Sequence, residues 1–160
     1  MKFISVLVAL FSFSAFANPQ LGEYIVHQGV AAGKAVKLKT WYAMYSESKM
    51  MIRTETTVAG SPTQIDDEWI EEAEIFNHGT AIQILNLCAA LGGNIEALQL
   101  PLGTFNTCKV KGTTLSAQGY SVPSFLGDAW IWLGDLPITG VAKAVGDDFS
   151  LELSSYQWNF

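Results

Sequence analysis

The sequence predicts an α+β domain that is mostly antiparallel sheet and has one main helix. Short runs in which apolar and polar residues alternate recur along the chain, and glycine and other turn residues separate them, as in antiparallel sheets. One segment, at about residues 80–91, instead has apolar residues at helical spacing. No internal repeat, low-complexity tract or linker interrupts these patterns. We therefore expect a single β-rich domain at 18–160.

The first 17 residues have the pattern of a secretory signal peptide. Lys2 precedes an apolar run at 3–13, and the small residues Ala15 and Ala17 stand at the −3 and −1 positions of a cleavage site. The run is too short to span a bilayer. The alternative is a buried first helix, but nothing polar alternates through the run. We therefore expect cleavage after Ala17 and a mature protein that is periplasmic or secreted.

The charge of the mature chain limits its partners. Removal of Lys2 leaves 9 − 1 = 8 basic residues against 15 acidic ones, so the net charge is 8 − 15 = −7. An acidic domain without a basic run is not expected to bind nucleic acid, and an anionic membrane surface would repel it. No later apolar run is long enough for a transmembrane helix in the mature chain.

Four strands are predicted in the first half of the mature chain. They are LGEYIVHQ from Leu21, KAVKLKTWYAMYS from Lys34, MMIRTETTV from Met50, and a return strand at Ile65–Glu71 after the turn Gly60-Ser61-Pro62. The last one is ambiguous, because DDEWIEEAEIF is also rich in the helix formers Glu and Ala. We favour the strand, in which Ile65 and Trp69 share one face.

The helix is predicted to begin at Thr80, which forms a capping-box pattern with Gln83. The apolar positions that follow share one helical face: Ala81, Ile84, Leu85, Cys88 and Leu91. Gly92 and Gly93 end the helix, one of them as a left-handed cap. Cys88 is therefore expected on the buried face of the last turn.

Five more strands follow the glycines. They are predicted at Ile95–Leu100, Thr104–Val110, Asp128–Leu133, Gly140–Val145 and Phe149–Trp158, with Gly146-Asp147-Asp148 as a hairpin turn. The segment AWIWL is apolar on both faces. This pattern indicates either a central strand that is covered on both sides or an exposed aromatic ridge.

Several segments resemble a set of uncharacterised exported bacterial proteins. In order, they are LGEY, a helix that ends in CAALGG, LPLGTFNTCKV with the pattern P-x-G-T-F-x-T-C-K, AWIWLGDLPITGVAKA and a closing LELSSY. The same layout is similar to that of envelope proteins with a LolA-like open half-barrel, a curved antiparallel sheet with helical cover. The resemblance covers most of residues 21–158 and implies this fold. LolA-like folds often shelter acyl chains or other apolar ligands, so it also implies an apolar ligand.

The two cysteines are predicted to form a disulfide. Export places Cys88 and Cys108 in an oxidising compartment, where a pair of thiols is usually bridged. The glycines after Cys88 let the chain reverse, and two strands return Cys108 toward the helix. Reactive thiols are disfavoured, because redox pairs usually have C-x-x-C spacing at a helix start and Cys88 lies near a helix end.

No catalytic, metal or cofactor site is predicted. The only histidines are His27 and His78, the cysteine spacing does not fit zinc, and neither a nucleophile elbow nor a phosphate loop occurs. The acidic stretch Asp66–Glu74 offers oxygen ligands for a cation but lacks the spacing of a calcium loop. The aromatic residues of the last sheet are expected in the core rather than in an apolar pocket or a carbohydrate platform: Trp130, Trp132, Tyr156 and Trp158.

The expected function is that of an exported, non-enzymatic binding protein of the cell envelope or secretome. Its partner would be an apolar small molecule or an envelope protein, and its ligand-binding residues are not identified. Two alternatives stay open. The aromatic ending SSYQWNF is how many outer-membrane β-barrels end, although the predicted helix and Glu152 in the last strand argue against one. The other alternative is a small hydrolase-like enzyme with an unrecognised site.

Overall fold

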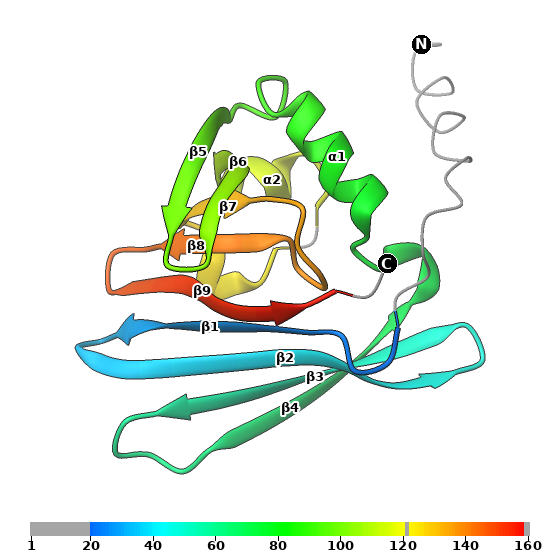
Figure 1. The fold of residues 1–160 in the computed structure, drawn as a ribbon, viewed down its shortest axis with the longest axis vertical. Helices are drawn as coiled ribbons and strands as arrows, with labels where there is room; N and C mark the ends of the chain where they lie inside the picture. Colours follow the sequence, from blue (N-terminus) through cyan, green and yellow to red (C-terminus); the bar gives the residue numbers. More distant parts are fainter. Residues whose placement is uncertain (1–19, 121, 159–160) are drawn as a thin grey trace.

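A nine-stranded antiparallel sheet dominates the computed structural model, which describes residues 20–120 and 122–158 (Figure 1). The strands are β1 (Tyr24–Ala31), β2 (Lys34–Ser46), β3 (Lys49–Val58), β4 (Gln64–Glu71), β5 (Asn94–Leu100), β6 (Gly103–Lys111), β7 (Trp130–Leu133), β8 (Val141–Val145) and β9 (Phe149–Gln157). Their order in the sheet is β4-β3-β2-β1-β9-β8-β7-β6-β5. The sheet is curved and open, with β4 and β5 at its edges, so the predicted fold class is confirmed.

Each of the nine predicted segments forms a strand. The ambiguous stretch after the Gly60 turn pairs along its whole length with β3, from Gln64 to Glu71, so the strand was the correct choice over the helix. Within that stretch, only Glu72–Glu74 form a short 3-10 helix, and a second 3-10 helix lies at Ser124–Leu126. The predicted signal peptide and its cleavage site lie outside the described residues.

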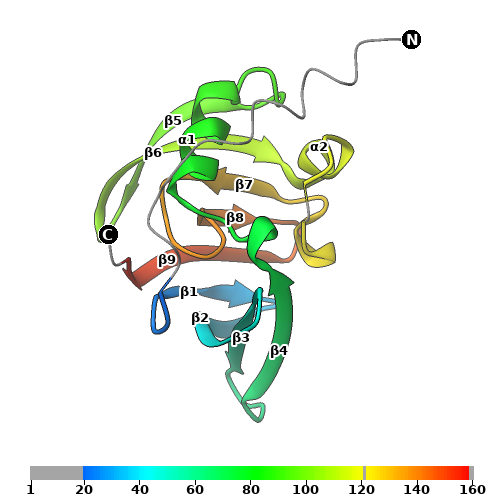
Figure 2. The same cartoon turned by 90° about the vertical axis from the view of Figure 1, so that its right-hand side faces the viewer.

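The first and last strands of the domain are neighbours. β1 pairs with β2 on one side and with β9 on the other, so it joins the β1–β4 half of the sheet to the β5–β9 half. Figure 2 shows how the two halves follow one another around the curve of the sheet. Because this pairing joins opposite ends of the chain, it fixes which residues of the two halves share a face.

The main helix, α1 (His78–Leu87), begins and ends earlier than predicted. Its N-cap is Asn77, whose side-chain oxygen accepts a hydrogen bond from the Thr80 backbone N–H at 3.0 Å. The predicted capping box at Thr80 is therefore wrong, since Asn77 already satisfies that group. Cys88 is the C-cap, and Gly92 adopts the left-handed conformation with φ of 75° that was expected of one glycine.

A second helix, α2 (Gly112–Ala117), was not predicted. It follows β6 directly and buries Gly112 and Leu115. Its six residues are too few to show a helical period in the sequence, and β-branched Thr113 and Thr114 are poor helix formers. Packing against the sheet, rather than local propensity, therefore accounts for it.

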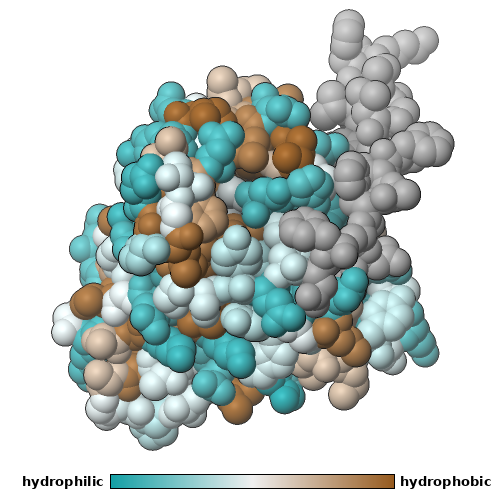
Figure 3. Space-filling view, viewed as in Figure 1, coloured by the Kyte–Doolittle hydropathy of each residue, from teal (hydrophilic) through white to brown (hydrophobic). Residues whose placement is uncertain are grey.

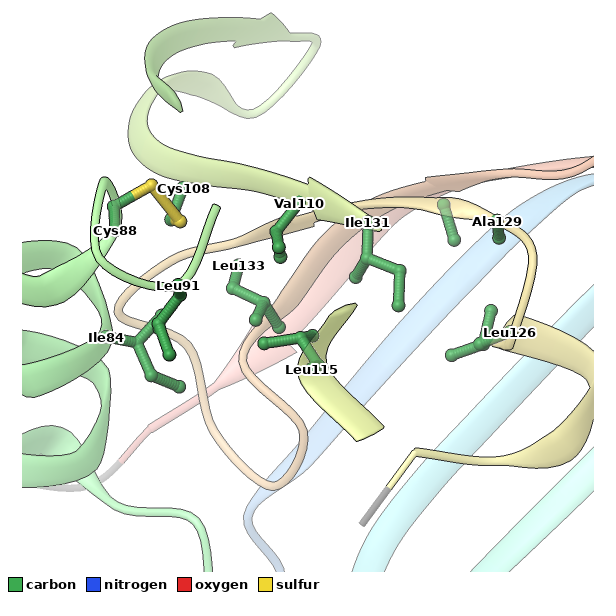
Figure 4. Close-up of a cluster of buried hydrophobic side chains, with 11 residues drawn as sticks. Ile84, Cys88, Leu91, Cys108, Val110, Leu115, Leu126, Ala129, Ile131 and Leu133 are labelled. Atoms are coloured by element: carbon green, nitrogen blue, oxygen red, sulfur yellow. A yellow bond between two sulfur atoms is a disulfide. The ribbon is translucent and has the colours of Figure 1, made fainter. Parts of the chain in front are cut away.

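One hydrophobic cluster lies between the two helices and strands β6–β8 (Figure 4). Its members are Ile84, Cys88, Leu91, Cys108, Val110, Leu115, Leu126, Ala129, Ile131, Leu133 and Ala144. The predicted disulfide is present: Cys88 and Cys108 are bridged with their Cα atoms 5.6 Å apart, and both are buried. The bridge fastens the end of α1 to β6.

A second cluster joins the two halves of the sheet. It includes Ile25, Tyr42 and Leu153 from strands of the sheet and Leu136 and Ile138 from the loop that precedes β8. These five residues are at most 4% exposed. The cluster therefore fills the space between this loop and the centre of the sheet with packed side chains.

Candidate functional site

One face of the sheet points away from the helices. Val110 and Ile131 contribute to the cluster beneath α1 and α2, so their strand neighbours Lys109 and Trp132 point to the other side. Cross-strand partners continue this face through the sheet in the order Lys109, Trp132, Lys143, Glu152, Gln28, Lys37 and Thr57. Residues directly opposite one another share a face, so one surface runs from β6 to β3.

We call the strand positions on this surface the Trp–Lys face. Of the eight basic residues in the described part of the chain, seven occupy it: Lys37, Lys39, Lys49, Arg53, Lys109, Lys111 and Lys143. Four of the five tryptophans do so too: Trp41, Trp69, Trp130 and Trp132. The alternation of the strands thus sorts both residue types to one side.

The tryptophans of this face are not all core residues. Trp132 is only 8% exposed, but Trp130 is 38% exposed. Tyr156 on β9, which is opposite Ile25 and so belongs to the other face, is 40% exposed. The expectation that the aromatic residues of the last sheet are plain core therefore holds for Trp132 and is wrong for Trp130 and Tyr156. AWIWL is both a central strand and, at Trp130, an exposed aromatic position.

Lysine ammonium groups lie over the aromatic rings of the face. Lys109 Nζ is 4.9 Å from the ring centroid of Trp132 and 5.4 Å from that of Trp130, and Lys111 Nζ is 4.9 Å from Trp130. Lys143 approaches Trp132 from the neighbouring strand, at 5.7 Å. These distances allow cation–π attraction, which holds the flexible lysine side chains against the sheet.

The same arrangement recurs in the other half of the sheet. Lys39 Nζ lies 5.6 Å from the ring centroid of Tyr24 and 5.1 Å from that of Trp41. Next to Trp41 on β3, Arg53 donates two hydrogen bonds to Asp67, at 2.6 and 2.7 Å. The Arg53 hydrogen bond lowers the pKa of Asp67, so this carboxylate stays ionised well into acid.

Carboxylates complete the network around Trp132. The indole N–H of Trp132 donates to Glu96 at 2.9 Å, and Lys109 Nζ lies 3.4 Å from the same carboxylate. The Trp132 hydrogen bond, with a smaller contribution from Lys109, lowers the pKa of Glu96. Lys143 pairs with Glu152 at 2.6 Å. The face therefore presents ordered donors and acceptors next to aromatic rings.

The disulfide contributes to this face indirectly. Cys108 precedes Lys109 in β6, and its sulfur is on the side of the helices. Gly93 is packed against the bridge, where an added Cβ would lie 2.8 Å from the Cys108 sulfur and 2.9 Å from the Cys88 sulfur. The bridge thus fixes the strand that carries Lys109 and Lys111.

The two histidines lie apart and have different surroundings. His27 is 8% exposed, and its Nε2 donates to the Val141 carbonyl oxygen at 2.7 Å. Burial lowers the pKa of His27, which indicates a neutral structural residue. His78, the first residue of α1, has its Nδ1 2.7 and 2.8 Å from the two carboxylate oxygens of Asp135. An aspartate in this position orients a histidine that acts as a general base.

The acidic stretch at the edge of the sheet does not form a cluster of ligands. Asp67 pairs with Arg53, and Glu71 pairs with Lys49 at 2.8 Å. In the part of the chain that the structure describes, no three His, Cys, Asp or Glu residues converge as a metal site. A shallow hollow of about 400 Å³ lies beside this edge and is lined by Ser48, Glu71, Glu72 and Ala73.

The sequence contained only part of the signal for the Trp–Lys face. Lys37 and Lys39 alternate with apolar residues in the sequence, and so do Lys109 and Lys111. That both pairs share one surface depends on the β1–β9 pairing, which no local pattern reveals.

Within residues 20–120 and 122–158, no helix has the length and apolar character needed to cross a membrane. In comparisons with known proteins, the chain matches no protein-family model, no curated protein and no solved structure.

Proposed function

We propose that this chain is an exported binding protein without catalytic activity, and that it binds its partner on the Trp–Lys face. The observation that carries the proposal is the concentration of seven basic residues and four tryptophans on that one surface. Tryptophan, tyrosine and arginine are enriched where proteins recognise partners, and a concentration of lysines attracts partners of negative charge. The rest of the molecule is acidic, so the residues suited to binding a partner are gathered on this one surface.

Export is supported by the n-, h- and c-region pattern of residues 1–17 and by the Cys88–Cys108 disulfide. Disulfides persist in oxidising compartments and are rare in the cytosol. The protein would therefore act in the periplasm or outside the cell, where envelope material is available as a partner.

Surface binding fits the geometry better than the sheltering of an acyl chain in a LolA-like cavity. The apolar side chains that line the helices and the centre of the sheet are packed against one another. The 400 Å³ hollow is shallow and has two glutamates in its lining. On the side seen in Figure 3, apolar residues form small groups between hydrophilic ones rather than one continuous patch.

Expression of the whole chain in a bacterial host, followed by fractionation, tests the proposal. We expect mature protein that begins at Asn18, sediments with envelope material at low ionic strength and is released by salt, because salt screens exposed charges. Uncleaved protein that still begins at Met1 and is found in the cytoplasm would contradict export. Protein that stays in the soluble fraction at every ionic strength would contradict surface binding.

An apolar-dye assay separates this proposal from the carrier that the LolA-like resemblance implies. A fluorescent apolar dye should gain no signal with the folded protein, since the apolar clusters are packed. Strong dye uptake that bound lipid displaces would instead favour a carrier of apolar ligands.

The His78–Asp135 pair favours one second candidate, a small hydrolase-like enzyme. The carboxylate contacts Nδ1 and would fix the orientation of the ring. Both cysteines are bridged and cannot act as the nucleophile, so His78 as a general base would activate a hydroxyl group or water. The test is hydrolysis of ester substrates by the wild type and by the variants His78→Ala and Asp135→Asn. Activity in the wild type that is lost in both variants would establish the enzyme, and equal turnover by all three proteins would refute it.

A further inference from the structure

The Trp–Lys face makes the molecule electrically asymmetric. Its strand positions hold seven basic residues and five acidic ones, Glu55, Asp67, Glu71, Glu96 and Glu152, for a net charge of 7 − 5 = +2. The rest of the described chain holds one basic residue and ten acidic ones, for 1 − 10 = −9. The two sums give the −7 of the described residues. A negatively charged partner is therefore attracted to this face and repelled elsewhere.

The lysines of this face are ordered before any partner arrives. Lys109 lies against two tryptophan rings and within reach of Glu96, and Lys143 lies between Trp132 and Glu152. Their side chains are only 29% and 24% exposed. Binding that uses side chains already held in place loses less conformational entropy. The face therefore offers ammonium groups at fixed positions.

The spacing of these groups suits an extended chain. Lys109 and Lys111 are two residues apart in β6, about 6.8 Å along the strand. Lys143 lies two strands from Lys109, about 9.6 Å across the sheet. Glu96 and Glu152 lie among the lysines and can accept hydrogen bonds from hydroxyl groups. Charged donors, carboxylate acceptors and indole edges thus alternate over one surface.

We propose that the Trp–Lys face binds an acidic polysaccharide, with its anionic groups on Lys109, Lys111 and Lys143 and its hydroxyl groups on the intervening carboxylates. The inference rests on the proposed function and names its ligand class. A polysaccharide of this kind carries both groups that the face is built to meet, anions and hydroxyls.

An anionic membrane and a nucleic acid fit the same surface less well. A planar anionic membrane would contact the carboxylates of the face as well as the lysines of the face, and the carboxylates would repel it. Trp132 is also too buried to enter the lipid interface. Single-stranded nucleic acid binds by stacking bases on open aromatic faces. Here lysine ammonium groups lie over the rings of Trp130 and Trp132.

Calorimetric titration of the mature, disulfide-bonded protein with polygalacturonate tests the inference, with neutral dextran of similar length as the comparison. We expect binding to polygalacturonate alone, weakened at least about tenfold as salt rises from about 0.05 to about 0.5 M. The triple variant K109Q/K111Q/K143Q should lose at least tenfold in affinity. Lys111→Gln should weaken binding, whereas Lys34→Gln, the matched change of a lysine outside the face, should not.

Three results would overturn the inference. They are equal binding to dextran, equal loss in Lys34→Gln and Lys111→Gln, and binding only to phosphatidylglycerol vesicles or to oligothymidylate. The last would assign the face to a membrane or a nucleic acid. A fourth result, absence of all binding with salt-released envelope association intact, would also overturn the inference but would leave the proposed function standing. Melting curves of each variant confirm that the fold is retained.

Discussion

The Cys88–Cys108 bridge closes a loop that begins at the C-cap of α1 and contains β5 and the first part of β6. Its two cysteines are 20 residues apart in the chain. On the chain-entropy account, closing a loop of about 21 residues stabilises the fold by about 3 kcal/mol. The double variant C88A/C108A should therefore lose about 3 kcal/mol in the free energy of unfolding, measured by urea denaturation.

Chemical reduction provides the matched control for this variant. Wild type treated with reductant should unfold at the same urea concentration as C88A/C108A, because both lack the bridge. The reductant should leave the variant unchanged. A wild type whose midpoint is the same with and without reductant, and equal to that of the variant, would show that the bridge does not stabilise the fold.

His27 should make stability depend on pH below neutrality. Burial lowers the pKa of His27 in the native state, while the unfolded chain has a value near the ordinary 6.5. Between these two values the unfolded state binds a proton that the native state does not, so stability falls as pH decreases from about 6.5 toward the native pKa. Thermal melting of the wild type between about pH 7.5 and pH 5 should show this loss.

The variant His27→Gln isolates that contribution. A glutamine amide donates a hydrogen bond, as Nε2 does to the Val141 carbonyl, but it does not titrate. The stability of the wild type relative to that of the variant should therefore decrease as pH falls, while the carboxylates contribute equally to both. A difference that is constant from pH 7.5 to pH 5 would mean that His27 titrates alike in the folded and unfolded chains.

At the scale of elements, the start of α1 depends on one side chain. The Asn77 side-chain oxygen accepts hydrogen bonds from the Thr80 backbone N–H at 3.0 Å and from its hydroxyl at 3.3 Å. Asn77→Ala leaves that N–H without its cap and should lower the free energy of unfolding by about 1 kcal/mol. Asn77→Asp keeps the acceptor and should stay close to wild type in the same denaturation experiment.

A different result would show that Thr80, the residue indicated by the sequence pattern, is the N-cap. If Asn77→Ala unfolds like the wild type and Thr80→Ala loses about 1 kcal/mol, Thr80 rather than Asn77 caps the helix in solution. The comparison of the two alanine variants decides between them.

Local patterns predicted the strands well because they are determined by alternation and turns. The alternation of Ile52 and Thr54 with Arg53 and Glu55 in β3, followed by the turn at Gly60, is sufficient to place the β3–β4 hairpin. The same patterns failed at α1 and α2 for a physical reason. The T-x-x-Q pattern placed the cap at Thr80, but Asn77, three residues earlier, also has a side chain that can cap a helix, and only the fold decides which oxygen meets which N–H. The six residues of α2 have no period to detect.

At the scale of the whole molecule, the net charge does not show how charge is distributed over the surface. A net charge of −7 argued against nucleic acid and an anionic membrane surface as partners. The sheet nevertheless places seven of the eight basic residues in the described part of the chain on one face. The pairing of β1 with β9, from opposite ends of the domain, joins the two groups of lysines. Such long-range register is not encoded in any short stretch, so the candidate site emerged only from the structure.

The open sheet also leaves β4 as an edge strand, and its charge should keep the protein from pairing with itself. Ile65 and Trp69 on β4 are 59% and 45% exposed, a combination that invites pairing with another chain. Ion pairs with Arg53 and Lys49 balance the charges of Asp67 and Glu71. Repulsion between two copies of β4 therefore depends mainly on Asp66 and Glu68, which lie on the other face of the strand.

The variant D66N/E68Q should consequently associate through β4. We expect light scattering with size-exclusion chromatography to show dimers or larger species that increase with protein concentration, while the wild type stays monomeric. E72Q/E74Q is the matched control, since it removes the same charge from the 3-10 helix just beyond the strand and should not associate. Equal association of both variants would indicate that net charge, rather than the charge of the edge strand, keeps the molecules apart. If both variants stay monomeric, the exposed edge needs no charge to remain unpaired.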